Sequence, residues 1–285
     1  MPSLIDIRRR IRSVKNTQQI TKAMKMVSAA KLRRAQDRVI AARPYSVLLG
    51  KVLANVAAAA AVDPDAGSNL LVAQRPQQKI LLVVVTSDKG LAGAFNSNLI
   101  KGAQRFIAEH RDAEVILELI GRKGRDFFRK RSTRISGDYI NLSAKPSYEQ
   151  TAPIAQKAME MYRNAEIDAV YLLYNEFKSM VAQKLTLTRV LPVEVPERAT
   201  PVDYIFEQPP VQMLDALLPR YVEMAFYRAL LESTAAEHAA RMTAMEAATS
   251  NASEMIEKLT LYMNRVRQAS ITKEIIEVVS GAAAG

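Results

Sequence analysis

Hydrophobic residues near the start of the chain recur at alternating intervals of three and four positions. Leu4, Ile7, Ile11 and Val14 follow this rhythm, which is typical of the seam where one helix of a coiled coil faces its partner. The residues around them are mostly good helix formers, such as lysine, arginine, alanine and methionine. The pattern predicts a long helix from residue 3 to about residue 60.

The predicted seam becomes polar in its middle. Its next positions are Gln18, Thr21, Lys25 and Ser28, and apolar residues then return at Leu32, Ala35 and Val39. Two interpretations remain open. Either the seam shifts locally to the neighbouring stripe of Ile20, Met24 and Val27, or the polar segment, residues 18–28, contacts a partner protein.

The end of the chain has the same helical character. No glycine or proline occurs between Arg220 and Ser280, so a helix is expected from about residue 210 to residue 280. Its seam is predicted at Met255, Leu259, Tyr262, Val266 and Ala269. Two such helices would run on the order of 80 to 100 Å and need each other's apolar faces. We therefore expect an antiparallel coiled coil of the N- and C-terminal helices, with kinks at Pro44 and Pro219.

Between these helices, apolar runs alternate with helical patterns. Lys79–Thr86 is a continuous β-branched run, typical of a strand buried on both faces. Further strands are expected near residues 115–120, 134–142, 169–177 and 185–195, and helices near 97–110, 121–131 and 148–165. This alternation predicts a small, mostly parallel sheet of Rossmann-like topology. The predicted fold class is α+α/β, divided into an N-terminal coiled-coil helix (1–62), a central α/β domain (63–208) and a C-terminal coiled-coil helix (209–285).

The positive charge of the chain is concentrated in the first helix. Residues 1–51 hold thirteen Lys and Arg but only Asp6 and Asp37, whereas the remaining 234 residues hold 27 basic and 27 acidic side chains. This helix is expected to face an acidic protein surface, anionic lipid or nucleic acid, and a merely solvated basic face is the ordinary alternative. A basic coiled-coil nucleic-acid-binding protein is therefore the alternative function. Nucleic-acid binding favours interleaved aromatic residues, and Tyr45 is the only one among the first 90.

Candidate chemistry is sparse. The chain has no cysteine, which excludes disulfides and thiol catalysis. His110 and His238 have no partner at ligand spacing, so no metal site is predicted. The loop Ser87–Gly93 after the first strand and the turn Gly121–Gly124 are the best candidates for phosphate binding, but neither matches a P-loop or a dinucleotide-binding motif. A tight turn and a solvated basic turn are their ordinary interpretations, and no catalytic site or cofactor is predicted.

Specific strings of sequence then resemble the gamma subunit of F-type ATP synthases. They are DIRRRIRSVKNTQQITKAMKMVSAAKLRRAQ (6–36), TSDKGLAGAFN (86–96), LPRYVE (218–223), ARMTAMEAATSNA (240–252) and RQASITKEIIEVVSGAAAG (267–285). They occur in the family's order, and the two most distinctive strings lie at opposite ends of the chain. The resemblance therefore covers the whole sequence.

The resemblance implies a mechanical function. In that family the coiled coil is the central rotor shaft, present in one copy per complex, and the α/β domain lies at its foot near the membrane. The shaft transmits rotation of the proton-driven c-subunit ring to the catalytic sites of the alpha/beta ring during ATP synthesis. The implied partners are the alpha, beta and epsilon subunits and the c ring. No nucleic acid is implied, the membrane is reached only through the complex, and the chain itself is not an enzyme.

The family's contact residues carry over by their position in these motifs. Contacts of the shaft with the alpha/beta ring are expected at Arg8, Arg9, Met24, Lys25, Arg241, Gln268 and Thr272. Contacts of the foot with the c ring and epsilon are expected at Arg43, Tyr45, Tyr204 and Glu207. The apolar C-terminal end is expected to turn in an apolar collar. The family motif begins within a few residues of Met1, which favours a bacterial protein on the cytoplasmic face of the inner membrane, without a presequence.

Overall fold

The computed structural model describes residues 3–60, 69–180, 182–194 and 207–283. They fall into two compact units. The first unit combines residues 1–29 with residues 241–285, and the second comprises residues 30–240. We describe each unit by itself, and the three-domain division expected from the sequence stays a prediction.

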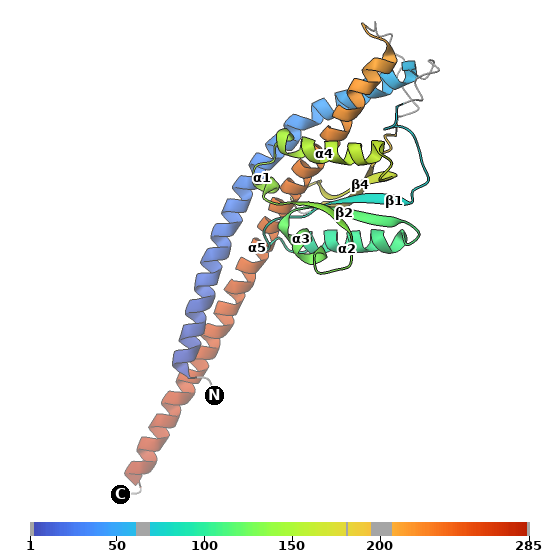
Figure 1. Cartoon of the computed structure of the whole chain (residues 1–285). Coiled ribbons are helices and arrows are strands. Elements are labelled where there is room, and N and C mark those ends of the chain that lie inside the picture. The colour runs from blue at the N-terminus through green and yellow to red at the C-terminus, as the bar shows by residue number, and fades with distance from the viewer. Residues whose placement is uncertain (1–2, 61–68, 181, 195–206, 284–285) are drawn as a thin grey trace. The chain divides into compact units, whose positions relative to one another are not determined.

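The described residues form two long helices, one at each end of the chain. The sequence between them forms an α/β part with one sheet and three shorter helices. The helices are α1 (Leu4–Ala60), α2 (Phe95–Glu109), α3 (Arg122–Phe128), α4 (Tyr148–Arg163) and α5 (Pro210–Ala283), with a 3₁₀ turn η2 at Leu142–Ala144. The strands are β1 (Lys79–Val85), β2 (Glu114–Ile120), β3 (Ile135–Tyr139), β4 (Ala169–Phe177) and β5 (Gln183–Leu191). Figure 1 shows these elements along the colour ramp. Each long helix continues through its internal proline, Pro44 in α1 and Pro219 in α5.

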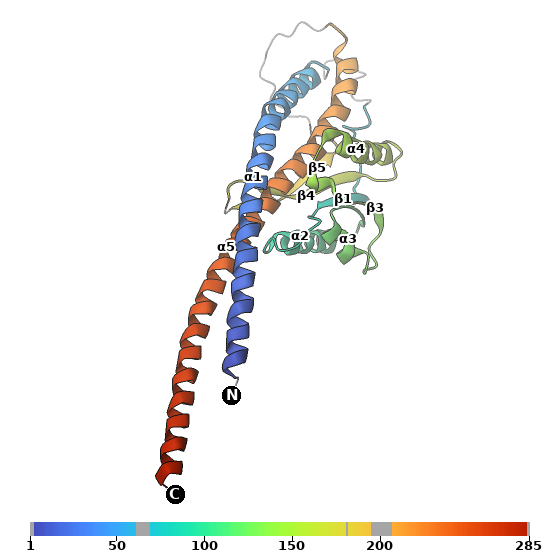
Figure 2. The same ribbon diagram turned by 90° about the vertical axis from the view of Figure 1, so that its left-hand side faces the viewer.

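The first unit is an antiparallel pair of helical segments, as the sequence predicts (Figure 2). Gln18 pairs with Ser253, Thr21 with Thr249 and Lys25 with Glu246. The residue number of the partner in α5 falls as the residue number in α1 rises, so the two segments run antiparallel. At the start of α1, the Ser3 backbone N–H and hydroxyl both donate to Asp6 Oδ2, and the Asp6 backbone N–H donates back to Ser3 Oγ. This reciprocal cap satisfies donors that a helix start leaves unpaired. It also lowers the pKa of the Asp6 carboxyl.

The seam of α1 follows the predicted positions through its polar segment. Thr21 and Ser28 are buried, whereas Ile20 and Val27 are 60% and 56% exposed. The expected local shift of the seam to Ile20, Met24 and Val27 is therefore wrong, because hydrogen-bonded hydroxyls and amides fill the interface instead.

The seam of α5 in this unit differs from the predicted one. Met255 and Tyr262 are exposed, while Leu259 and Val266 are half-buried as expected. The buried and half-buried stripe continues instead through Ala252, Ile256, Leu259, Met263 and Val266. Two apolar stripes run side by side here at coiled-coil spacing, and contact with α1 selects one of them.

The second unit contains a five-stranded sheet in the order β3-β2-β1-β4-β5. Strands β1 to β4 run parallel, and β5 pairs antiparallel with β4. The predicted Rossmann-like alternation is confirmed, with shifted ends: the fifth strand covers Gln183–Leu191 rather than 185–195, and α2 begins at Phe95.

Strand β1 lies at the centre of this unit and is buried on both faces from Ile80 to Val85. On one face, Leu81 and Val83 belong to a core shared with α4 and with the α1 and α5 segments of the unit. Helices α2 and α3 cover the opposite face (Figure 1). A strand enclosed in this way reads as a continuous apolar run because neither face meets water.

Within α1 one 18-residue window reaches a mean hydropathy of 1.2, and 33% of that window is buried. By length and composition alone such a helix is compatible with a membrane span. Core helices of soluble proteins pass the same test, so this is weak evidence for membrane insertion.

Gly121 is required by the close approach of β1 and β2 at their carboxyl ends. It adopts φ +95°, and a Cβ there would lie 2.2 Å from the backbone oxygen of Thr86. Both the left-handed backbone and the lack of space exclude a side chain. Gly50 offers a contrast, because a Cβ built on it meets nothing within 4 Å.

We expect Gly121→Ala to lower the free energy of unfolding by about 2–4 kcal/mol, since it combines backbone strain with a clash against buried backbone. Thermal unfolding followed by circular dichroism measures the change. The matched control is Gly50→Ala in α1, which should be neutral or stabilising by about 0.5–1 kcal/mol because alanine is the better helix former. Equal melting temperatures for the two variants would contradict this account.

Candidate functional site

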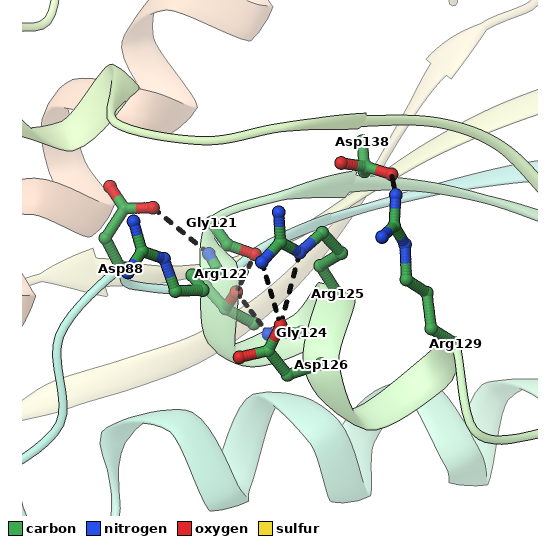
Figure 3. A network of polar contacts seen from close by, with 9 residues as sticks. Asp88, Gly121, Arg122, Gly124, Arg125, Asp126, Arg129 and Asp138 are labelled. Atoms are coloured by element: carbon green, nitrogen blue, oxygen red, sulfur yellow. Dashed lines mark hydrogen bonds and ion pairs between the residues drawn. The ribbon is translucent and has the colours of Figure 1, made fainter.

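The carboxyl edge of the parallel sheet is where a Rossmann-like fold binds ligands. Asp88 follows β1 there and accepts three hydrogen bonds. Oδ1 accepts from the Arg122 backbone N–H at 3.1 Å, and Oδ2 accepts from the Asn141 N–H at 3.0 Å and the Ser143 hydroxyl at 3.1 Å. The first of these bonds lies at the start of α3 (Figure 3). The protein's own carboxylate therefore occupies the donors that a phosphate would use.

The turn Gly121–Gly124 is likewise saturated by protein groups. Thr86 Oγ1 donates to the Ile120 carbonyl at 2.9 Å and accepts the Gly124 N–H at 2.9 Å. The basic side chains that follow are paired as well, Arg125 with Asp126 and Arg129 with Asp138 (Figure 3). These contacts support the interpretation of this segment as a structural turn rather than a phosphate-binding turn.

The loop Ser87–Gly93 is held by its own hydrogen bonds. The Ser87 hydroxyl donates to the Lys89 carbonyl at 2.6 Å, and the Ser87 N–H donates to Asn96 Oδ1 at 3.0 Å. Leu91 and Gly93 adopt φ of +60° and +54°. The loop is a tight turn, in agreement with its ordinary interpretation. Among the described residues no group of three or more His, Asp or Glu side chains is placed to hold a metal ion.

The predicted shaft contacts lie in the helical pair of the first unit. Arg8, Arg9, Gln268 and Thr272 are exposed, and Met24 and Lys25 are half-buried. The Lys25 ammonium lies 2.6 Å from Glu246 Oε1, in an ion pair whose side chains are 39% and 60% exposed. Because both partners reach solvent, this pair contributes little to stability and can exchange partners readily.

Arg241 differs from the other predicted shaft contacts because it is buried, with 8% of its surface exposed. It makes polar contacts within the chain. A guanidinium in this position has little surface left for a partner subunit. Its predicted contact therefore requires that neighbouring side chains move and expose it.

The end of α5 exposes a group of large apolar side chains. Residues 271–280 are exposed throughout. The apolar ones among them are Ile271, Ile275, Ile276, Val278 and Val279, with exposures from 48% to 72%. Exposed clusters of this kind mark interaction surfaces in soluble proteins.

Of the predicted foot contacts, Tyr45 is 49% exposed, Glu207 is exposed, and Tyr204 lies outside the described residues. Arg43 has an internal partner that the sequence did not indicate. Its Nη2 lies 3.4 Å from Oε1 of Glu232, whose side chain is 1% exposed. The other Glu232 oxygen accepts the Phe177 backbone N–H at 3.2 Å. Arg43 thus joins α1 to α5 and to the end of β4.

Two further buried carboxylates were missed by reasoning from the sequence. Glu223 of α5 accepts hydrogen bonds from the Tyr148 hydroxyl and from Gln156 Nε2, the latter at 2.8 Å. Glu118 of β2 is 1% exposed, and the Lys157 ammonium lies 3.0 Å from it. For Glu118 a signal was present, since this acid interrupts the apolar run from Val115 to Ile120. Only the fold, however, supplies the partner.

The bond to Glu223, assisted by burial, raises the pKa of the Tyr148 hydroxyl to about 12. The hydroxyl must stay protonated to donate to a carboxylate. This contact therefore stabilises the fold at neutral pH and is lost at strongly alkaline pH.

A family model described as ATP synthase matches residues 3–284. The ATP synthase gamma chain of Solibacter usitatus is 75% identical over 284 residues, which cover 100% of this chain and 99% of the relative. The ATP synthase gamma chain of Anaeromyxobacter sp. (strain Fw109-5) is 52% identical over 289 residues, with 100% and 99% covered.

Solved structures show the same fold. The match to the central stalk and c ring of the Tetrahymena thermophila mitochondrial ATP synthase has a TM-score of 0.63 and 26% identity, and it covers 80% of this chain and 99% of that chain. A chain of the Euglena gracilis mitochondrial ATP synthase, in a structure of OSCP, F1 and the c ring, matches with a TM-score of 0.68 and 18% identity, and coverage of 99% and 94%. At that identity the second likeness concerns the fold alone.

Arg43→Ala is expected to lower the free energy of unfolding by about 1–3 kcal/mol, because the buried Glu232 carboxylate loses its cation. Denaturant unfolding measures the loss. Arg33→Ala is the matched control: Arg33 is an exposed arginine of the same helix, and its loss should cost less than about 0.5 kcal/mol. Adding Glu232→Gln to Arg43→Ala should recover part of the stability. A cost no larger than that of the control would refute the internal role of Arg43.

The Tyr148–Glu223 contact predicts a stability loss at high pH. Because the folded pKa, about 12, lies above the ordinary value near 10, the stabilisation is complete below pH 10 and disappears as the pH rises to 12. The difference in melting temperature between the wild type and Tyr148→Phe should therefore shrink over this interval. A constant difference from pH 8 to pH 12 would show that Tyr148 does not titrate as described.

Proposed function

The chain belongs to the ATP synthase gamma-chain family, and from this premise we propose how its structure works as the central rotor shaft of an F-type ATP synthase. The observation that carries the proposal is the antiparallel pairing of the two chain ends, seen in the bonds from Gln18 to Ser253 and from Thr21 to Thr249. Two paired helices resist bending and twisting far better than one, so a pair can transmit torque.

The chain acts as a component of the complex and, we propose, catalyses nothing by itself. Support comes from the carboxyl edge of its sheet, where Asp88 and Thr86 occupy the backbone donors of Arg122 and Gly124. A nucleotide phosphate would have to displace these internal bonds. The catalytic sites belong to the alpha/beta ring, and this chain changes their affinity by turning.

The exposed face of α1 suits a partner that moves past it. Arg8 and Arg9 are exposed, and the ion pair of Lys25 reaches solvent. Exposed ion pairs are worth about 0–1 kcal/mol each. A ring of acidic surfaces on the beta subunits could thus exchange contacts with these cations one after another, and no deep energy minimum would halt rotation.

The end of α5 supports a different kind of contact. Gln268 and Thr272 precede the exposed apolar side chains of Ile275, Ile276 and Val279. Apolar contact is non-directional, so such a tip could rotate inside an apolar collar of the alpha/beta ring without breaking oriented hydrogen bonds. We place the hydrogen-bonding contacts of the shaft at Gln268 and Thr272, just before this tip.

The α/β part forms the foot of the shaft in this proposal. Tyr45 of α1 and Glu207 just before α5 are exposed, and we place the contacts with the c ring and epsilon at these residues, at Arg43 and at Tyr204. The complex is membrane-associated, and we propose that it lies on the cytoplasmic face of a bacterial inner membrane, with this chain reaching the membrane only through its partners.

Reversal of charge on α1 tests the electrostatic part of the proposal. We expect the combined change of Lys22, Lys25, Lys31 and Arg33 to Glu to reduce coupled ATP synthesis in the reconstituted complex by about tenfold or more. Four weak contacts together correspond to at most about 4 kcal/mol, and each 1.4 kcal/mol is a factor of ten. Rates are measured in vesicles energised by a proton gradient, with assembly checked by the recovery of one copy per three alpha/beta pairs.

The control carries four reversals on exposed cations of the second unit that are not part of α1, at Lys101, Arg111, Lys130 and Lys145. It should assemble and synthesise ATP at close to the wild-type rate. If the α1 variant matches this control, the electrostatic coupling is refuted. If the unmodified chain does not assemble with alpha and beta subunits at all, the proposed function itself fails.

A further inference from the structure

A small hollow in the second unit has three basic side chains of α1 in its lining, beside apolar and hydroxyl side chains. Lys31, Arg34 and Arg38 of α1 form one wall, Thr234 and His238 of α5 the opposite wall, and Ser143 of η2 closes it, with a volume of about 120 Å³. We call it the basic hollow. It lies beside the η2 turn, and of its lining residues only Lys31 is also among the α1 cations whose charge reversal is proposed above.

The three cations of the basic hollow repel one another. They are spaced three and four residues apart on α1 and so lie on one face of the helix, where like charges destabilise. Among the ion pairs of the described residues, none includes Lys31, Arg34 or Arg38. An anion in the hollow would relieve this repulsion.

Three acidic groups near the hollow are engaged elsewhere, while a fourth, Asp37, directly precedes Arg38 on α1 and is exposed. Asp88 accepts the Ser143 hydroxyl together with two backbone N–H groups. Glu232 is paired with Arg43, and Glu237 also has an interaction within the chain. Asp37 can offset one of the three positive charges at most, so the hollow keeps a net positive charge.

The size of the hollow limits what it can hold. A buried water needs roughly 10–15 Å³ of such space, so a volume of about 120 Å³ accepts a tetrahedral oxyanion with a few waters. It is too small for a whole nucleotide. Ala35 also lines the hollow, and its small side chain leaves room there for a ligand.

The donors in the hollow match a phosphate group. Arginine binds phosphate through two parallel N–H bonds, and lysine adds a compact charge. The hydroxyls take a minor part, because Ser143 already donates to Asp88 and Thr234 already donates to the Leu230 carbonyl. Binding therefore depends on the cations of α1.

We propose that the basic hollow is a binding site for a phosphate-class anion, either free inorganic phosphate or the terminal phosphate of a larger molecule. The anion bridges α1, α5 and the η2 turn, all within the second unit. Because it binds only where these three elements meet, it stabilises the folded unit by mass action. The proposal shares Lys31 with the rotor function but is tested separately, because its readout is phosphate binding to the isolated chain.

Isothermal titration calorimetry of the full chain with sodium phosphate tests the proposal, at constant ionic strength set with sodium chloride. We expect saturable binding to the wild type. Arg34→Gln combined with Arg38→Gln should weaken the affinity for phosphate by about tenfold or more, since each substitution removes a charge-assisted contact. The matched control Arg33→Gln, a neighbouring exposed arginine that does not line the hollow, should bind as the wild type does.

Two further measurements identify the source of the phosphate and check that the variants fold. Titration with ATP at the same ionic strength gives a competing isotherm if a terminal phosphate enters, and no competition if only the free ion fits. Circular dichroism verifies that the double variant folds; if it does not, the single variant Lys31→Gln replaces it. Absence of saturable phosphate binding to the wild type, or equal affinity in the wild type and the arginine variant, would overturn the proposal.

Discussion

The structure depends on helices α1 and α5 burying each other's inner faces. Neither could persist alone in water over its length, since an isolated helix gains too little from its own hydrogen bonds. In the first unit the contact is partly polar, through Gln18, Thr21 and their partners Ser253 and Thr249. In the second unit it is apolar, with Leu53 of α1 and Phe226 of α5 in one core with the sheet.

These two kinds of contact suit different demands. Hydroxyl and amide pairs contribute about 0.5–1.5 kcal/mol each, less than a buried leucine or phenylalanine, but they fix the register of the helices relative to each other. An apolar core gives stability. The first unit thus gains a defined register at some cost in stability, while its outward apolar side chains, such as Ile20 and Met26, remain exposed. This distribution fits a helical pair whose outer surface is used by partners.

The α/β part illustrates that a fold does not imply an activity. Its parallel strands end at an edge that binds nucleotides in many proteins of this topology. Here Asp88 takes the donors of Arg122 and Asn141, and Thr86 takes that of Gly124. The same backbone groups that could hold a phosphate instead close the turn. Buried acids such as Glu232 and Glu223 add connections from α5 to the neighbouring elements.

By itself the sequence determined the type and order of the main elements and the family. Element type follows from local periodicity: the apolar run Ile80–Val85 is a strand because both its faces are buried, and residues 6–36 carry a motif specific enough to identify relatives. Tertiary structure alone decided which stripe of α5 is buried, because Met255 and Ile256 are equally apolar and only contact with α1 distinguishes them. It also decided that Asp88 closes the sheet edge and that Arg43 pairs with Glu232. Those partners lie tens to hundreds of residues apart, and no local pattern records which distant group the folded chain will bring within hydrogen-bond distance.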